Sequence, residues 1–95
     1  MRPYELMYLI PPTADEERLN AVSERLQTAI TGLGGKIDKV TPPTRRRLAY
    51  EVAHHRDGHY GVLEFSLPPE QSREFDRTIR LTEDILRHLV VRRDE

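Results

Sequence analysis

The segment YGVLEFSL at residues 60–67 is the part of the sequence that decides the fold. Its side chains alternate with a period of two, which is the pattern of a β-strand with one buried face. One face would carry Leu63, Phe65 and Leu67, and the other would carry Val62, Glu64 and Ser66. Asp57-Gly58 precedes the segment and Pro68-Pro69 follows it, and both pairs are typical of turns. The sequence therefore predicts a strand over residues 60–67.

A strand over residues 4–10 and an amphipathic helix over residues 13–33 are predicted at the start of the chain. Thr13 and Glu16 would form a capping box at the beginning of this helix. The apolar residues of the helix recur at spacings of three and four, which places them on one stripe that would face a sheet. They are Leu19, Val22, Leu26, Ile30 and Leu33.

A second strand is predicted over residues 36–52, where Pro42-Pro43 would bend it or confine it to a sheet edge. A second helix would open at Pro68-Pro69, and a last strand would cover residues 85–93. The order β-α-β-β-α-β predicts an α+β fold of the ferredoxin-like type. Its four-stranded antiparallel sheet would have the order 2-3-1-4, with two helices on one face. Residues 1–95 would form a single domain.

The other face of this sheet would be uncovered and unusually apolar. Met7 and Leu9 of the first strand would face outward, beside Tyr60 and Val62 of the third strand. A protein partner that covers this face would explain the pattern. Two alternatives stay open, because scattered apolar side chains are common on protein surfaces and a shift of one residue would exchange the two faces.

Composition and charge limit the classes of function. The 95 residues include no cysteine, which excludes disulfides and cysteine-based zinc sites. The apolar run at residues 6–10 is too short to span a bilayer, and the first residues lack the apolar segment of a signal peptide. We therefore expect a cytoplasmic protein, with neither a membrane nor DNA as a partner. The net charge of −1 argues against strong nucleic-acid binding by the whole surface, so local basic patches would have to provide it.

No arrangement of residues in the sequence fits a catalytic or metal site. The loop at residues 11–13 lacks the glycines and backbone donors of an acylphosphatase-type phosphate cradle. His54, His55 and His59 could bind a metal together with Asp57, but their spacing matches no ligand motif and favours a solvated turn. We predict a protein that is not an enzyme and that binds no metal and no cofactor.

Two stretches carry basic residues and no acidic ones, at residues 39–50 and 85–93. Arg45, Arg46 and Arg47 are the sharpest feature of the first stretch. Side chains alternate along a strand, so these three could reach one ligand only from a loop or a bulge. A solvated basic loop is the alternative interpretation. Arginine is well suited to bidentate contact with phosphate, which favours RNA phosphates as the ligand.

The predicted order of elements is also that of the RNA-recognition motif, whose third strand stacks bases on aromatic side chains. Tyr60, Gly61 and Phe65 fit that motif, whereas His59 and Val62 stand where it has a glycine and an aromatic residue. The sheet therefore lacks a stacking platform. If the chain binds RNA, we expect it to contact phosphates and not to stack bases.

Several segments together resemble one known family. They are MRPYE at residues 1–5, Gly35-Lys36-Ile37, RRLAYEVA at residues 46–53, His59-Tyr60, and LRHLVVR at residues 86–92. In this order they are similar to the sixth protein of the bacterial small ribosomal subunit. The chain departs from the common pattern of that family at Pro43-Thr44, at Glu51 and at His54.

The resemblance implies a ferredoxin-like protein of ribosome structure and assembly. Such proteins pair with a small basic partner, the eighteenth small-subunit protein, and bind the central domain of the small-subunit ribosomal RNA. With the basic stretches, this predicts RNA contacts by Arg2, Arg45, Arg46, Arg47, Arg87, His88, Arg92 and Arg93. The residues predicted to contact the protein partner are Met7, Leu9, Leu48, Tyr50, Tyr60 and Val62. A regulatory module of the same fold that binds small molecules between subunits is the alternative function.

Overall fold

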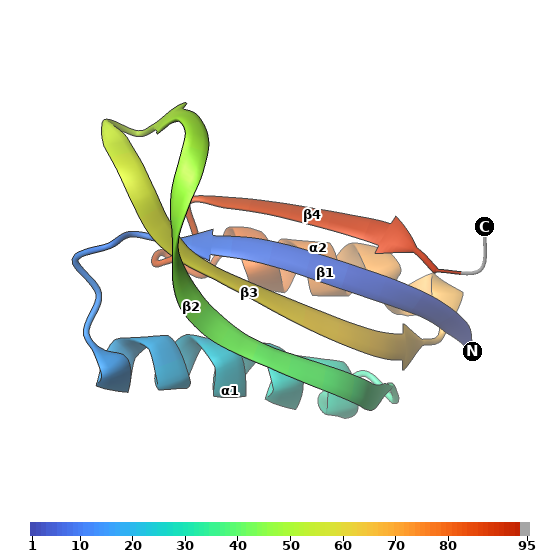
Figure 1. Ribbon diagram of the computed structural model, residues 1–95. Helices are drawn as coiled ribbons and strands as arrows, with labels where there is room; N and C mark the ends of the chain where they lie inside the picture. Colours follow the sequence, from blue (N-terminus) through green and yellow to red (C-terminus); the bar gives the residue numbers. More distant parts are fainter. Residues whose placement is uncertain (94–95) are drawn as a thin grey trace.

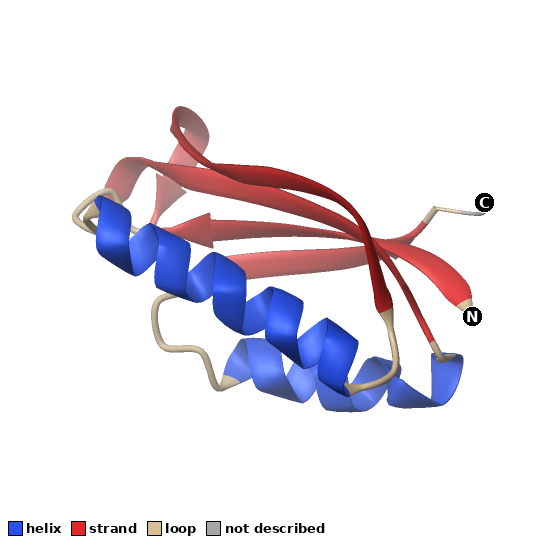
Figure 2. Ribbon diagram, turned by 90° about the horizontal axis from the view of Figure 1, so that it is seen from below, coloured by secondary structure: helices blue, strands red, loops and turns tan. Residues whose placement is uncertain are grey.

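Four antiparallel strands form a sheet in the order β2-β3-β1-β4, and two helices cover one of its faces (Figures 1 and 2). The computed structural model describes residues 1–93. The strands are β1 (Arg2–Ile10), β2 (Lys36–Val52), β3 (His55–Leu67) and β4 (Arg87–Arg92). The helices are α1 (Glu16–Gly32) and α2 (Ser72–Arg80), and a 3-10 turn at Pro69–Gln71 precedes α2. The predicted fold class and strand order are confirmed.

The hydrophobic core lies between the two helices and the inner face of β1 and β3. Phe65 of β3 meets Phe75 of α2 edge to face, with ring centroids 5.1 Å apart. The predicted alternation of residues 60–67 is confirmed, because Leu63, Phe65 and Leu67 are all buried. The rest of the core consists of Tyr4, Leu6, Tyr8, Ile10, Val22, Leu26, Ile30 and Ile79.

Helix α1 begins later than the sequence predicts. Asp15 is its N-cap residue, and the Asp15 carboxylate accepts a hydrogen bond from the backbone N–H of Arg18 at 2.8 Å. The predicted capping box at Thr13 is therefore wrong. The backbone N–H of Ala14 donates to the carbonyl oxygen of Pro11 at 3.2 Å, so this segment is a turn that ends before the helix starts.

Strand β2 continues through Pro42-Pro43 and is not interrupted there. A register shift against β3 between Thr41 and Thr44 accommodates the two prolines. β2 is an edge strand, as predicted, and an edge strand tolerates residues without a backbone N–H. Because β2 continues beyond the prolines, it pairs with the first part of β3, and the two form a ribbon that extends past the helices (Figure 1).

This ribbon turns at Ala53 and His54, whose φ angles are positive at 48° and 68°. Two adjacent residues with positive φ are the usual connection of a tight β-hairpin. Strand β3 starts at His55, so most of the predicted polar turn is strand, and His59 is buried where a solvated side chain was expected. Residues 44–59 are called the hairpin below, and the side of the sheet that the helices leave uncovered is called the outer face.

Candidate RNA and protein interface

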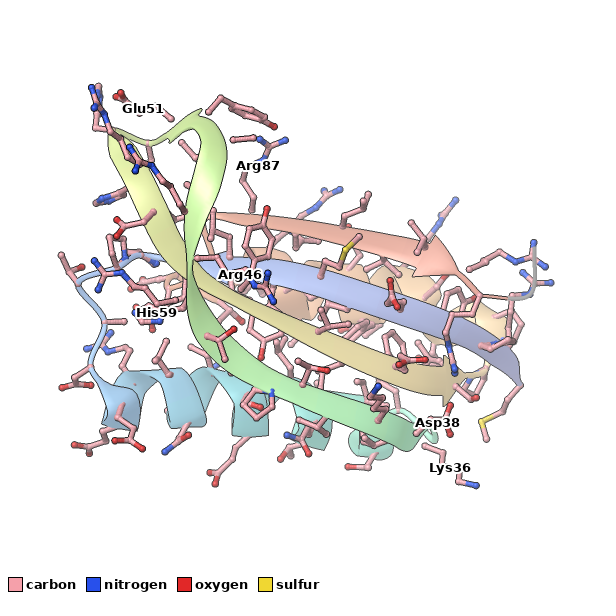
Figure 3. The ribbon with its side chains drawn as sticks, viewed as in Figure 1. Lys36, Asp38, Arg46, Glu51, His59 and Arg87 are labelled. Atoms are coloured by element: carbon pink, nitrogen blue, oxygen red, sulfur yellow. The ribbon has the colours of Figure 1, made fainter. Side chains whose placement is uncertain are left out.

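The three consecutive arginines of β2 lie in regular strand pairing. Arg45 pairs with His59, Arg46 with Gly58 and Arg47 with Asp57, all in register with β3. Successive residues of a paired strand point to opposite faces, so Arg46 shares the outer face and its two neighbours lie on the other side. Figure 3 shows Arg46 on the outer face of the sheet. No bulge places all three arginines on one face of the strand.

Arg45 is already engaged by a carboxylate of the hairpin. Its Nε and Nη2 atoms both donate to the Oδ2 atom of Asp57, at 2.9 and 2.7 Å. Both side chains keep a large exposed fraction, 58% for Arg45 and 37% for Asp57. An ion pair with this exposure contributes little to stability, but it fixes the direction of the Arg45 guanidinium group.

Arg87 joins the two basic stretches of the sequence. It lies at the start of β4, and its Nη1 atom donates to the hydroxyl oxygen of Tyr50 at 2.6 Å. The Arg87 guanidinium carbon is 5.6 Å from the centroid of the Tyr50 ring, within the range of a cation–π contact. Tyr50 belongs to the hairpin, so this contact holds the end of the hairpin beside β4 (Figure 3).

Arg93 was predicted to contact RNA, but its side chain is used inside the protein. Its Nε donates to the carbonyl oxygen of Tyr4 at 2.8 Å, and its Nη2 donates to that of Phe65 at 3.1 Å. The same guanidinium pairs with Asp38 at 2.6 Å and with Glu64 at 3.3 Å. These partners lie on β1, β2 and β3, so Arg93 connects the end of β4 to the other three strands.

His88 also has a partner within the protein. It pairs with Tyr8 across β1 and β4, so its ring lies on the helix side of the sheet and not on the outer face. Its Nε2 is 3.0 Å from Oδ1 of Asp76 on α2, and 23% of the side chain is exposed. His88 therefore connects β4 to α2, and an RNA contact by this residue stays a prediction.

The remaining predicted arginines lie at the opposite end of the sheet from the hairpin. Arg2 starts β1 and pairs with Leu67, and Arg92 ends β4 and pairs with Tyr4. Both register positions belong to the helix side of the sheet. The arginines predicted to contact RNA thus lie in two places, at the hairpin with the start of β4, and where β1 starts and β4 ends (Figure 1).

The apolar outer face is present, with one exception to the prediction. Met7 pairs with Val62 and Leu9 pairs with Tyr60, as expected for one shared face. Leu9, however, is only 1% exposed, which contradicts the prediction of an accessible contact at this position. The reason is Gly58, which packs so closely that an added Cβ atom would lie 2.7 Å from the Leu9 Cδ1 atom.

A groove of about 280 Å³ crosses this outer face between the hairpin and β4. Tyr50 and Tyr60 border it from the hairpin side, with exposed fractions of 64% and 38%. Leu89 borders it from β4 and is 54% exposed, although it was not among the predicted contacts. Side chains alternate along a strand, so Leu89 lies on the same face as Arg87 and Val91. Because Leu89 pairs with Met7, this alternation could have predicted that Leu89 belongs to the outer face.

The comparison with known proteins identifies the family. The family model for ribosomal protein S6 matches residues 3–92 of the chain. The chain belongs to the ribosomal protein S6 family. It is accordingly a ribosomal protein of the small subunit with a structural rather than a catalytic role, and the predicted resemblance is confirmed.

Individual S6 proteins agree with this assignment over the full length. The small ribosomal subunit protein bS6 of Carboxydothermus hydrogenoformans is 37% identical, covering 100% of this chain and 99% of that protein. The bS6 protein of Desulforamulus reducens is 36% identical over 100% of both chains. The crystal structure of 30S ribosomal protein S6 from Thermotoga maritima superposes with a TM-score of 0.92 and 34% identity. It covers 98% of this chain and 88% of that one.

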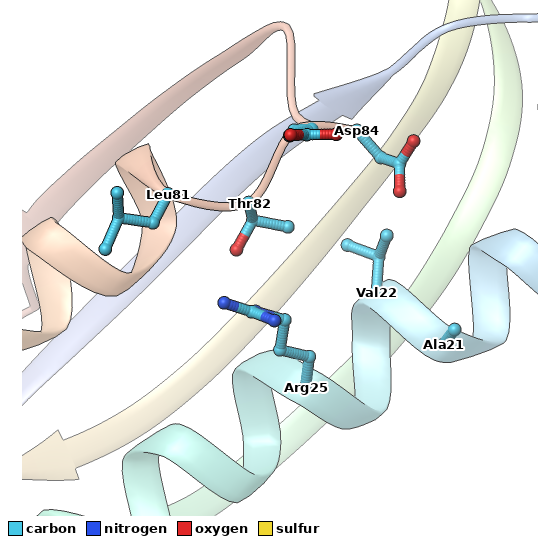
Figure 4. Close-up of a pocket in the computed structure, with 7 residues that line it drawn as sticks. Ala21, Val22, Arg25, Leu81, Thr82 and Asp84 are labelled. Atoms are coloured by element: carbon cyan, nitrogen blue, oxygen red, sulfur yellow. The ribbon is translucent and has the colours of Figure 1, made fainter.

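The helix side of this S6-family fold contains a second depression, between α1 and the connection from α2 to β4 (Figure 4). Two of its four polar side chains are engaged within the chain. The Thr82 hydroxyl donates to the carbonyl oxygen of Thr78 at 2.8 Å, and Asp84 pairs with Arg18 at 2.9 Å. The other two polar side chains of the depression are Arg25 and Glu83, which form no ion pair among residues 1–93.

Within the part of the chain that the structure describes, no three His, Asp or Glu side chains are grouped to hold a metal ion. None of the helices among residues 1–93 has the length and apolar character needed to cross a bilayer.

Proposed function

We propose that this small-subunit protein binds small-subunit ribosomal RNA in the cytoplasmic ribosome together with a small basic ribosomal protein. The resemblance implies the central domain of the RNA and the eighteenth small-subunit protein as that partner. The observation that carries the proposal is the outer face, where an accessible apolar groove lies directly beside arginines of the hairpin and β4. One surface would thus offer both a protein contact and a phosphate contact.

The RNA contact is expected to come from arginines that keep exposed guanidinium groups. Arg46 and Arg87 lie on the outer face, and Arg2 lies at the far end of the sheet. Arginine binds phosphate with two parallel hydrogen bonds, whereas the outer face offers no row of aromatic rings for bases to stack on. We expect affinity that depends strongly on salt and weakly on base sequence.

The protein contact is expected on the apolar groove. Met7, Val62, Tyr60 and Leu89 share the outer face. The chain has a net charge of −1, so a basic partner would supply much of the positive charge that RNA binding needs. Burial of exposed apolar side chains would provide the affinity between the two proteins, at about 25 cal/mol per Å².

Filter binding to a central-domain RNA fragment, with and without the basic partner, tests the joint mechanism. Leu89→Glu should weaken RNA binding in the presence of the partner by about tenfold or more, equivalent to about 1.4 kcal/mol. The matched control is Leu81→Glu, because Leu81 is 62% exposed but lies beside α2 on the helix side. Equal effects of the two variants, or no gain of affinity from the partner, would contradict the proposal.

The salt dependence of the same binding reaction tests the RNA contact. Arg87→Ala should lower the slope of log affinity against log salt by about 0.9, the value for one lost phosphate contact on a duplex. The control is Arg73→Ala, which changes an exposed arginine of α2 on the helix side of the sheet and should leave the slope unchanged. A slope that is the same in both variants would remove Arg87 from the RNA contacts.

A further inference from the structure

The hairpin has no hydrophobic core of its own beyond its base. Gly58 and His59 are buried where the hairpin leaves the sheet, but none of residues 44–57 is buried. The strand pairing is also irregular toward the end of the hairpin, because β2 shifts its register against β3 between Arg47 and Val52. An isolated two-stranded ribbon is only marginally stable in water. Contacts outside the ribbon must therefore determine how the hairpin lies relative to the sheet.

One such contact joins the two edge strands of the sheet. Tyr50 belongs to β2 and Arg87 to β4, and these strands are the first and last in the order β2-β3-β1-β4. The two side chains meet because the hairpin continues past β3 and reaches the start of β4 (Figures 1 and 3). The contact therefore closes one end of the outer face.

Two different interactions act between Tyr50 and Arg87. Nη1 of Arg87 donates to the phenol oxygen at 2.6 Å, and the guanidinium carbon lies 5.6 Å from the ring centroid. Within residues 1–93, no acidic side chain forms an ion pair with Arg87, and the Tyr50 hydroxyl has no other hydrogen-bond partner. Loss of either side chain would thus remove this polar connection between the hairpin and β4. The contact is called the latch below.

The residues of the latch also border the apolar groove of the outer face. The floor and the opposite wall of the groove belong to regular strands of the sheet, whereas Tyr50 belongs to the unsupported part of the hairpin. If the hairpin moved freely, a partner that binds in the groove would have to order it first. Ordering a loop on binding costs free energy and lowers the affinity.

We propose that the latch preorganises the groove for the basic protein partner. Tyr50 and Arg87 are then positioning residues, because the latch fixes the hairpin and the hairpin fixes the shape of the groove. This inference rests on the proposed function and specifies how its protein site is formed. Arg87 also keeps donors for an RNA phosphate, because a guanidinium group has five N–H donors and Tyr50 takes one of them.

The first test measures the position of the hairpin in the free protein. The chain has no cysteine, so Glu51→Cys on the hairpin and Thr28→Cys on α1 place two spin labels at exposed sites. Double electron–electron resonance should give a narrow distance distribution for this labelled protein. Arg87→Met removes both interactions of the latch and should broaden the distribution. Tyr50→Phe removes the hydrogen bond alone and should broaden it less.

Tyr60→Phe is the matched control for the distance measurement. It removes a phenol hydroxyl that borders the same groove but has no hydrogen-bond partner among residues 1–93, so the distribution should stay narrow. A distribution that is equally narrow in Arg87→Met would show that the latch does not fix the hairpin. Equal broadening in Tyr60→Phe would mean that any change in the groove loosens the hairpin, which also contradicts the latch.

The second test measures the affinity for the eighteenth small-subunit protein without RNA, by isothermal titration calorimetry. Arg87→Met should weaken this binding about three- to tenfold, the loss expected for one hydrogen bond. A direct contact predicts the opposite sign, because a basic partner repels the charge of Arg87 and would bind the variant more tightly. Unchanged or tighter binding by Arg87→Met therefore overturns the proposal.

A double-mutant cycle shows whether Tyr50 acts through Arg87. Tyr50→Phe should weaken partner binding in the wild-type background and have almost no effect in the Arg87→Met background. Equal losses in both backgrounds would mean that the hydroxyl contacts the partner directly. Both residues are exposed, so urea denaturation should give nearly equal midpoints for wild type and the two single variants. Midpoints lowered in proportion to the lost affinity would indicate a role in general stability and contradict the positioning role.

The outcomes separate this inference from the proposed function. If wild type binds the partner and the two substitutions act independently, the latch is wrong and the proposed function stands. If wild type does not bind the partner at all, the proposed function is refuted together with the role of the latch in it.

Discussion

Strands β2 and β3 run through two regions of the molecule that depend on different forces. Under the helices, β3 places Leu63, Phe65 and Leu67 in the core, each no more than 1% exposed. In the hairpin, the same strand carries Arg56 and Asp57, and β2 carries its arginines in consecutive pairing. Apolar burial stabilises the first region, whereas the second exposes charges whose mutual repulsion favours an anionic ligand. One continuous pair of strands thus carries apolar core residues in one part and exposed charged residues in the other.

Two arginines show the same difference. Arg93 is 26% exposed and bonds to backbone and carboxylate oxygens of the other three strands. Arg46 is exposed and has no carboxylate partner within the described residues. A guanidinium group that is satisfied within the fold contributes to stability and has little left for a ligand. The environment of each arginine, and not its presence in a basic stretch, decides its role.

The largest expected effect on stability comes from a substitution in the helix-covered region. Phe65→Ala should lower the free energy of unfolding by about 3–5 kcal/mol, because it removes a ring that packs against Tyr4 and Phe75. Arg46→Ala in the hairpin should change it by no more than about 0.5 kcal/mol. Urea denaturation of both variants measures the contrast. Similar losses in the two would mean that the hairpin and the core are not energetically distinct.

The next largest effect on stability is expected at Gly61, which lies at the boundary of the two regions. A Cβ atom at Gly61 would lie 2.4 Å from Cζ of the Tyr8 ring, so Gly61→Ala should destabilise the protein by about 1–3 kcal/mol. Gly32 has nothing within 4 Å of the corresponding position, so Gly32→Ala should be neutral or stabilise by up to about 1 kcal/mol. Thermal unfolding monitored by circular dichroism compares the two. A harmless Gly61→Ala would show that the sheet can move the Tyr8 ring aside.

Arg93→Ala should have an intermediate effect of roughly 1–2 kcal/mol on the free energy of unfolding, because it leaves partly buried carboxylates without their partner. Its effect on the salt slope of RNA binding should be absent at temperatures where the variant is folded. Arg47→Ala should instead lower the salt slope of RNA binding and leave the free energy of unfolding nearly unchanged. If Arg93→Ala changed the slope and left stability intact, the assignment of Arg93 to the fold would be wrong.

The smallest effect concerns alkaline pH. Burial raises the pKa of the Tyr8 phenol above its ordinary value of 10.0, and the neighbouring Ser23 side chain partly opposes this shift. The folded state thus favours the protonated phenol, so its contribution to stability is complete below pH 10 and declines as the pH rises through the raised pKa. Tyr8→Phe should flatten this decline in urea denaturation curves. Tyr50→Phe in the exposed hairpin should leave this loss of stability at alkaline pH unchanged. An equal loss in wild type and Tyr8→Phe would mean that a group other than Tyr8 causes it.

The elements under the helices could be predicted because their signals are local. Alternation in residues 60–67 and spacings of three and four in α1 reflect the geometry of a strand and a helix. The N-cap was missed because Thr13 and Asp15 are both good capping residues, and the turn closed by Pro11 and Ala14 decides between them. In the candidate interface, a run of basic residues does not indicate Leu89, because Leu89 is an apolar residue within that run.

The sequence alone determined the order of the elements and the family, and it predicted the side of the sheet on which Met7 and Tyr60 lie. These depend on period, on short motifs and on the residues present. Only the tertiary structure decided that Leu9 is buried by Gly58 and that Arg93 is bound to Tyr4, its backbone partner 89 positions away. Such contacts join segments that are distant in the chain, so no local pattern records them. The role of each charged residue therefore follows from which remote carboxylate, carbonyl or ring the fold brings beside it.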